Sequence, residues 1–266
     1  MKKLILMVLL FGYTATQAQE LFVMTEPASN MPTGSIGFRL NQSAYKRVVN
    51  SGYNYFLMPE LMWGANKNLM IHTSLFVSNR TNNLETEGGS IYAKYRFFSV
   101  DDVHSHFRMA GFGRYSINNT QISQEAIDIM RHNSGYEMGL IATQLLGKMA
   151  ISSSLSFEKA LNNKKHDFPA SQSDNATNYT LSFGKLMYPK KYTNFKQTNI
   201  NVMLELIGQT LNENGKSYLD VAPSVQFIIH SQARIDIGYK TQLLSSMNRL
   251  SPNGAFLNFE YTFFNV

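Results

Sequence analysis

The chain has 266 residues and no cysteine, which excludes disulfide scaffolds and thiolate metal sites. Charged residues make up 16% of it and aromatic residues 12%, against roughly 25% charged residues in ordinary soluble domains. The formal net charge is +6. It becomes +4 when Lys2 and Lys3 are removed with the signal peptide predicted below. This mild positive charge argues little for a nucleic-acid partner. A chain poor in charge and rich in aromatic residues fits a β protein whose strands face two environments.

The first residues predict a secretory signal peptide. Lys2 and Lys3 precede an apolar run from Leu4 to Phe11, and small residues follow up to Ala18. A charged start, a short apolar stretch and small residues before a cleavage site are typical of such signals. A transmembrane anchor is the alternative, but the run is shorter than the ~20 residues that a spanning helix needs. We therefore expect cleavage after Ala18.

The rest of the chain alternates between apolar and polar residues, which is the pattern of β-strands. Near the C-terminus, Ile235, Ile237 and Tyr239 face one way, while Arg234 and Asp236 face the other. The same period recurs throughout and predicts about twelve strands, most of them near the ~9–11 residues of a tilted membrane strand. Their approximate cores are residues 33–42, 53–63, 68–79, 89–99, 105–116, 134–145, 149–160, 177–188, 197–210, 218–229, 233–244 and 255–264.

The connections between these strands alternate in length. The longer, polar ones are 43–52, 80–88, 117–133, 161–176, 211–217 and 245–254. The others, mostly tight, are 64–67, 100–104, 146–148, 189–196 and 230–232. Long loops on one side and short turns on the other are typical of outer-membrane barrels. Because the expected number of strands is even, both termini are predicted on the short-turn side, in the periplasm.

A soluble β-sandwich or lipocalin-like barrel is the alternative, because the alternation of apolar and polar residues does not say which face of a strand meets water. Aromatic residues near many strand ends favour the membrane, since such residues form girdles at both interfaces of a membrane barrel. A soluble eight-stranded barrel would also have no place for several of the predicted strands. We therefore predict an all-β fold: a transmembrane antiparallel up-and-down β-barrel of about twelve strands, preceded by a cleaved signal peptide.

The predicted organisation is a signal peptide at 1–18, an N-terminal segment at 19–33 and a β-barrel at 34–266. The N-terminal segment contains the apolar residues Phe22, Met24 and Met31. It extends either as a loose periplasmic tail, which is the commoner fate of a terminus, or into the lumen as a plug.

The end of the chain, Ala255-Phe-Leu-Asn-Phe-Glu-Tyr-Thr-Phe-Phe264, is rich in aromatic residues. An aromatic last strand after a signal peptide resembles Gram-negative outer-membrane β-barrel proteins, although Asn265 and Val266 replace the usual final aromatic residue. The hairpin 59–70 and the run 222–227 resemble transporter-like barrels, including a family linked to aromatic-hydrocarbon degradation. The resemblance implies an outer-membrane location, contact with outer-membrane lipid and dependence on the barrel assembly machinery. It implies no particular substrate.

If the apolar stripes face lipid, the other stripe faces the lumen. The candidate lumen-lining residues are Arg39, Glu60, Lys94, Arg96, Arg108, Arg114, Glu137, Glu158, Glu205, Asp220, Arg234, Asp236, Lys240 and Glu260. Basic and acidic residues balance in this set, which argues against a strongly anion-selective pore. The bases gather on the fourth and fifth strands and the acids on the sixth to tenth. This predicts either a transverse field across a wet lumen or a salt-bridge network that fills the barrel.

Residues 123–131 of the third long loop have a helical pattern. Ser123 is a possible cap, and Ala126, Ile127 and Met130 would share an apolar face with Ile122. Such a helix would be a lid over the barrel mouth or a short packing element.

One cluster has the composition of a metal site. Asp102, His104 and His106 fall close together, and Zn or Cu takes such ligands. The cluster lies on a predicted short turn, however, where polar residues are expected without a metal. Met58, Met62, Met70 and His72 are weaker candidates for Cu(I), and packing inside the lumen explains them much better.

No enzymatic motif is present. His72 and His230 are possible bases but have no marked serine partner, and Gly215-Lys216-Ser217 lacks the upstream glycine of a phosphate loop. We therefore expect no enzyme and no cofactor. Two functions remain: a channel or facilitator for a small solute, and a non-conducting structural or binding barrel that works through its loops.

Overall fold

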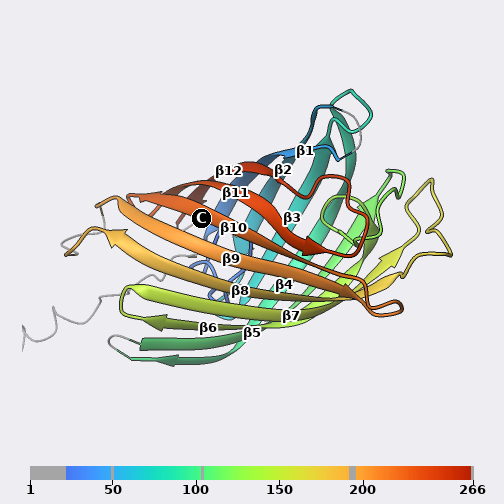
Figure 1. Ribbon diagram of the computed structural model, residues 1–266. Helices are drawn as coiled ribbons and strands as arrows, with labels where there is room; N and C mark the ends of the chain where they lie inside the picture. The colour runs from blue at the N-terminus through green and yellow to red at the C-terminus, as the bar shows by residue number, and fades with distance from the viewer. Residues whose placement is uncertain (1–21, 49–50, 103–104, 192–195, 265–266) are drawn as a thin grey trace, which may run out of the picture.

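The computed structural model describes residues 22–48, 51–102, 105–191 and 196–264, so the predicted signal peptide at 1–18 lies outside the described residues. The described residues form twelve β-strands (Figure 1). The strands are β1 (Ile36–Lys46), β2 (Tyr53–Gly64), β3 (Leu69–Ser78), β4 (Glu85–Asp101), β5 (Ser105–Asn118), β6 (Ser134–Leu146), β7 (Met149–Leu161), β8 (Asn175–Tyr188), β9 (Asn199–Leu211), β10 (Ser217–Ile229), β11 (Ala233–Ser245) and β12 (Gly254–Phe263).

The strands form a closed barrel. Each pairs antiparallel with its neighbours in chain order, and β12 returns to pair with β1. At this seam Arg39 lies opposite Glu260 on one side and Glu60 on the other. Closure leaves no sheet edge, so every strand has backbone partners on both sides. The predicted antiparallel up-and-down barrel of twelve strands is therefore confirmed. The described part of the chain contains no helix with the length and apolarity to span a bilayer.

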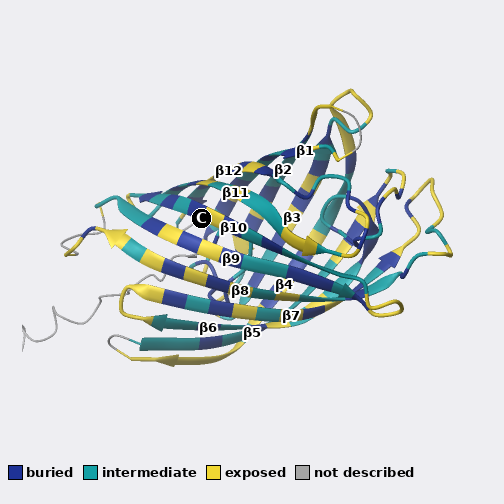
Figure 2. Ribbon diagram, viewed as in Figure 1, coloured by how far each residue is buried: buried dark blue, intermediate teal, exposed yellow. Residues whose placement is uncertain are grey.

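The outer surface of the barrel is apolar and its interior is mainly polar. Buried and exposed residues alternate along the strands (Figure 2). Trp63, Ile91 and Leu155 on the outer surface are 51%, 53% and 61% exposed, whereas Lys94 and Glu205 on the inner surface are 0% exposed. A continuous apolar outer band is costly in water and is what lipid requires. This arrangement is the reverse of a soluble barrel, so the surface is that of a transmembrane barrel.

Placing a charge in the centre of the outer band tests this orientation. Leu140 lies in the middle of β6 opposite Leu155 of β7, and it is 55% exposed. In lipid, Leu140→Arg is expected to destabilise the barrel by about 2–4 kcal/mol, because a charge at the bilayer midplane is poorly solvated. Urea unfolding of protein folded into vesicles measures this effect. Leu84→Arg is the matched control, because Leu84 is 59% exposed but lies in the connection before β4. Equal stability of the two variants would contradict the membrane orientation.

Several strands extend into residues that the sequence pattern assigns to loops. β1 begins at Ile36 and continues to Lys46, whereas the predicted core is 33–42. Tyr45, near the end of β1, is only 1% exposed, and its ring centre lies 6.2 Å from that of Phe56. β4 similarly runs from Glu85 to Asp101. Because the inside of the barrel is polar, polar residues at strand ends continue the strand, although in sequence they resemble a loop.

The chain enters β1 through a close contact with the end of β2. Gly34 N–H donates to the Gly64 carbonyl oxygen at 2.8 Å, and Gly64 N–H donates to the Ser35 carbonyl oxygen at 3.0 Å. A Cβ atom at position 64 would lie 2.3 Å from the Pro32 carbonyl oxygen. Glycine at this position therefore lets the N-terminal segment approach the barrel wall.

Candidate functional site

The described part of the N-terminal segment, residues 22–33, starts inside the barrel, near the short-turn end. Phe22 is 2% exposed and packs against Ala150 of β7 and Met203 of β9, together with Leu145 of β6. From there residues 22–33 pass across the lumen toward β2 and β3. The segment forms no strand, so it is held by side-chain contacts and not by a backbone ladder.

Glu205 of β9 holds the start of this segment. Its carboxylate accepts hydrogen bonds from the backbone N–H groups of Val23 at 3.1 Å, Met24 at 2.9 Å and Thr25 at 2.9 Å. The hydroxyl group of Thr25 donates a further bond at 2.8 Å. A buried carboxylate is strongly disfavoured unless hydrogen-bond donors or a cation surround it. The segment therefore supplies the donors that Glu205 needs, and Glu205 in turn fixes the position of the segment.

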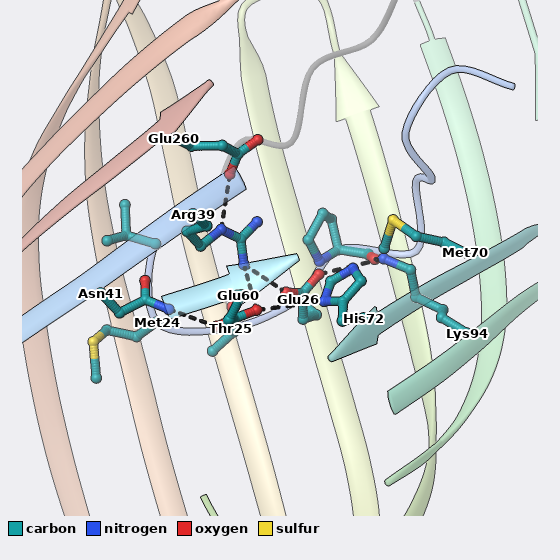
Figure 3. A network of polar contacts seen from close by, with 12 residues as sticks. Met24, Thr25, Glu26, Arg39, Asn41, Glu60, Met70, His72, Lys94 and Glu260 are labelled. Carbon is teal, nitrogen blue, oxygen red and sulfur yellow. Dashed lines mark hydrogen bonds and ion pairs between the residues drawn. The ribbon is translucent and has the colours of Figure 1, made fainter. Parts of the chain in front are cut away.

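The middle of the segment joins an ion-pair network at the closing seam (Figure 3). Arg39 Nη1 lies 3.1 Å from Glu26 Oε1, and Arg39 Nε lies 2.8 Å from Glu260 Oε2. Glu60 Oε2 is 3.9 Å from Arg39 Nη1, and Lys94 Nζ is 3.4 Å from Glu26 Oε2. Glu26 thus bridges cations on β1 and β4 and links the segment to both strands.

Further contacts fix the rest of the segment to the wall. They are Lys94 Nζ to the Pro27 carbonyl oxygen at 2.7 Å, Ala28 N–H to Thr143 Oγ1 at 2.9 Å, and Arg108 Nη1 to Ser29 Oγ at 3.0 Å. Met31 then packs with Met62 and Met70, and all three are buried. Residues 22–33 therefore lie within the barrel, and the expectation of a loose tail is wrong for them.

The connection between β5 and β6, residues 119–133, folds into the opposite end. Ile127 N–H donates to Gln209 Oε1 at 3.0 Å, and Gln209 Nε2 donates back to the Ile127 carbonyl oxygen at 2.8 Å. Ile129 N–H donates to Glu158 Oε1 at 3.1 Å. The loop is therefore bound to β7 and β9 through its own backbone and narrows the barrel from the loop side.

The predicted helix at 123–131, with Ser123 as its cap, is wrong. None of these residues is helical. At Ile127 and Ile129, backbone groups that a helix would pair with each other bond instead to the side chains of Gln209 and Glu158 in the barrel wall. The apolar residues that resembled one helix face, among them Ala126 and Ile127, pack against Ala160, Ala176 and Leu211 near the ends of three strands.

Acidic pH is expected to loosen this loop. The Glu125 carboxylate accepts hydrogen bonds from the Lys216 ammonium group and from the Asn248 N–H, and these bonds lower the pKa of Glu125 from its ordinary value of 4.5. A lowered pKa means that the stabilisation is complete above that ordinary value and disappears as the pH falls through the folded-state pKa. The protection of the backbone amides of residues 119–133 against hydrogen exchange, compared at about pH 7 and about pH 3, measures this loosening. Glu125→Gln should abolish most of the difference, and equal protection at both values in the unaltered protein would contradict this role.

A cavity of about 280 Å³ lies inside the barrel between these two structures. Met24 and Glu26 of the N-terminal segment line it from one end, and Ile127, Ile129 and Arg131 of the loop line it from the other. The lining mixes apolar and charged side chains, as small-molecule sites usually do.

The predicted lumen-lining residues occupy three kinds of position. Those that line the cavity are Arg39, Glu60, Arg114, Glu137, Glu158 and Lys240. Those that contact the N-terminal segment are Arg39, Lys94, Arg108 and Glu205. The others form contacts elsewhere in the barrel: Arg234 with Asp236 at 3.2 Å and Glu260 at 2.9 Å, Asp220 with Lys240 at 3.2 Å, and Arg96 with the Lys67 carbonyl oxygen at 2.6 Å.

Three cations of β4 and β5, namely Lys94, Arg108 and Arg114, have acidic partners close by. Beyond the pair of Lys94 with Glu26, Arg108 Nη2 lies 2.8 Å from Asp101 Oδ1, and Arg114 Nε lies 3.6 Å from Glu137 Oε2. The transverse field expected from the grouping of charges is therefore largely cancelled by local pairing.

The metal candidates do not come together in the described residues. His104 lies outside them, and His106 Nδ1 lies 2.8 Å from Asp101 Oδ1. No group of three or more potential ligands that includes Asp102, or any other described residue, is placed to hold a metal ion. His72 Nδ1 lies 3.6 Å from Glu60 Oε2, so it belongs to the seam network.

Important residues of the interior were absent from the sequence-based set. Glu26 lies in the N-terminal segment, and Arg131 and Arg249 lie in loops, so the alternation of the strands does not reveal them. One signal for Glu26 was available, because it is the sole charged residue between positions 22 and 38. Arg131 and Arg249 had no such signal.

No protein-family model and no curated protein sequence matches the chain. Among solved structures, the barrel is similar to an outer-membrane channel of Pseudomonas putida F1, with a TM-score of 0.60 and 11% identity over 91% of this chain and 100% of that one. The β-domain of the Bordetella autotransporter BrkA matches 87% of this chain and 100% of its own, with a TM-score of 0.47 and 10% identity. The first likeness shows a shared fold, that of an outer-membrane β-barrel.

Proposed function

We propose that the protein is an outer-membrane channel or facilitator for a small solute, closed by its own N-terminal segment. The exposed apolar band supports a place in lipid, and the predicted secretory signal together with this fold supports the outer membrane. We place both termini on the periplasmic side and expect assembly by the outer-membrane barrel machinery. The mechanism needs no catalytic group and no cofactor.

The observation that carries this proposal is the cavity of about 280 Å³ inside the barrel. It lies where a solute would pass from one end of the barrel to the other. A purely structural barrel would gain stability by filling this space, because each unfilled void forfeits packing contacts.

Opening is compatible with an intact barrel. Residues 22–33 form no strand with the wall, so their displacement breaks side-chain contacts and leaves the ladders between β1 and β12 complete. The N-terminal segment is therefore a gate that moves independently of the barrel. The loop 119–133 then sets the width of the path on the other side.

Single-channel recording in a planar bilayer tests the proposal. The purified mature protein is expected to give discrete and reproducible current steps, with long closed periods set by the N-terminal segment. A parallel gel-mobility assay, before and after heating, shows that the barrel is folded. A folded barrel that stays silent under all voltages would overturn the channel and favour the alternative, a non-conducting barrel that acts through its loops.

A further inference from the structure

Arg131 projects from the loop 119–133 into the cavity wall, where Asp128 of the same loop acts on it electrostatically but forms no ion pair with it. Its guanidinium carbon lies 4.9 Å from the ring centre of Tyr45 and 5.2 Å from that of Phe56. Among the described residues it forms no ion pair, although it lines the cavity. Asp128, in the same loop, has its Oδ1 atom occupied by the N–H of Met130 at 3.1 Å. A guanidinium placed against two rings is preorganised, with N–H donors left for an oxygen ligand.

A second cation lies beside the same ring. Lys240 Nζ is 5.0 Å from the ring centre of Tyr45 and 3.2 Å from Asp220 Oδ2. Asp220 is already engaged by Arg249, whose two terminal nitrogens each lie 2.6 Å from one of its oxygens. The single negative charge of Asp220 is therefore shared by Lys240 and Arg249, and this side of the cavity keeps an excess of positive charge.

His132 reports the same positive potential. Burial, together with the charges of Arg80, Arg131 and Lys240, holds the pKa of His132 well below its ordinary value. The imidazole ring is therefore neutral at pH 7 and adds no charge of its own. The His132 ring packs edge-on against the Phe56 ring, with 5.6 Å between the ring centres, and this contact keeps His132 beside Arg131.

The acidic groups on the opposite wall are held there by other contacts, so they form no ion pair with Arg131 or Lys240. Glu158 accepts hydrogen bonds from Ile129 N–H, Asn178 and Gln209, at 3.1, 2.7 and 3.1 Å. Glu137 accepts one from Ser156 at 2.7 Å and lies near Arg114. The cavity is thus polarised toward Arg131 and Lys240.

We propose that Arg131 and Lys240 form a binding site for a small anion, whose carboxylate or phosphate oxygens contact the guanidinium and ammonium groups. The proposal rests on the proposed function, since it names the class of solute that would occupy the path. The cavity volume of about 280 Å³ lies at the lower end of the range of small-molecule pockets, so we expect a small solute.

Calorimetric titration of the folded protein in detergent tests the site. Succinate and inorganic phosphate are the two probes, and glycerol is the neutral comparison. We expect one of the anions to bind, glycerol not to bind, and Arg131→Gln to weaken anion binding at least tenfold. Arg131→Lys, which keeps the charge but loses the planar fork, should retain part of the affinity. Succinate binding without phosphate binding would identify carboxylate as the ligand group, and the reverse would identify phosphate.

Arg47→Gln is the matched control. Arg47 carries the same charge near the loop-side end of β1, but its Nε atom donates to Asn54 and it does not line the cavity. Equal binding by all variants, or no binding of either anion to the unaltered protein, would overturn the site. Channel currents that neither anion reduces would also count against it while leaving the channel intact. Anion binding by a barrel that never conducts would instead overturn the channel and keep the site.

Discussion

Glu205→Ala is expected to raise the open probability of the channel at least tenfold. The substitution removes the acceptor for the N–H groups of Val23, Met24 and Thr25 and for the Thr25 hydroxyl group. Hydrogen bonds to a charged group contribute about 1.5–3 kcal/mol each, and about 1.4 kcal/mol already changes an equilibrium tenfold. In the closed state the freed N–H groups would lie in the lumen without their acceptor. In the open state water can reach them, so the balance shifts toward opening.

Planar-bilayer recordings of the variant and the unaltered protein measure this shift. Glu205→Gln keeps a neutral acceptor oxygen and should give an intermediate open probability. Glu213→Gln is the control, because Glu213 lies in the exposed connection after β9 and accepts a bond only from Asn175 at 3.1 Å among the described contacts. If the folded Glu205→Ala variant conducts like the unaltered protein, the N-terminal segment does not close the lumen.

The second large effect is expected at Arg39, where Arg39→Met should destabilise the barrel by about 3–5 kcal/mol. Arg39 is 7% exposed and holds Glu26 and Glu260 at 3.1 and 2.8 Å, with Glu60 at 3.9 Å. Without the guanidinium, the carboxylates lose the cation that they share and repel one another more strongly inside the barrel. Because Arg39 pairs across both the β1–β12 and the β1–β2 interfaces, the loss falls on the seam that closes the barrel.

Equilibrium unfolding by urea in vesicles gives the change in free energy. Arg47→Met removes a similar side chain outside the network and should change stability much less. Adding Glu60→Gln to Arg39→Met should restore part of the loss, because it removes one of the repelling charges, and the double-mutant cycle measures this coupling. If Arg39→Met is no less stable than Arg47→Met, the network does not hold the seam.

The strands and their number could be predicted from the sequence because the alternation of apolar and polar residues is a local property of each strand. In β11, Ile235 and Ile237 alternate with Arg234 and Asp236, and this suffices to orient the side chains to opposite faces. The even number of strands and the tight connections then predicted the closed barrel. Polar strand ends such as Ser43 to Lys46 were missed, because a polar lumen makes strand and loop look alike.

The tertiary structure alone decided what lies inside the barrel. The contact of Glu205 with Val23 joins residues 182 positions apart, and no local pattern encodes such a pairing. The apparent helix at 123–131 failed for the same reason, since Gln209 and Glu158 take the backbone bonds that a helix would make. The orientation of the stripes was also a tertiary outcome, because alternation is the same for a soluble and a membrane barrel. The sequence by itself thus determined a closed sheet of alternating strands. Long-range contacts decided the position of the N-terminal segment in the lumen, the cavity beside it and the place of Arg131 in the cavity wall.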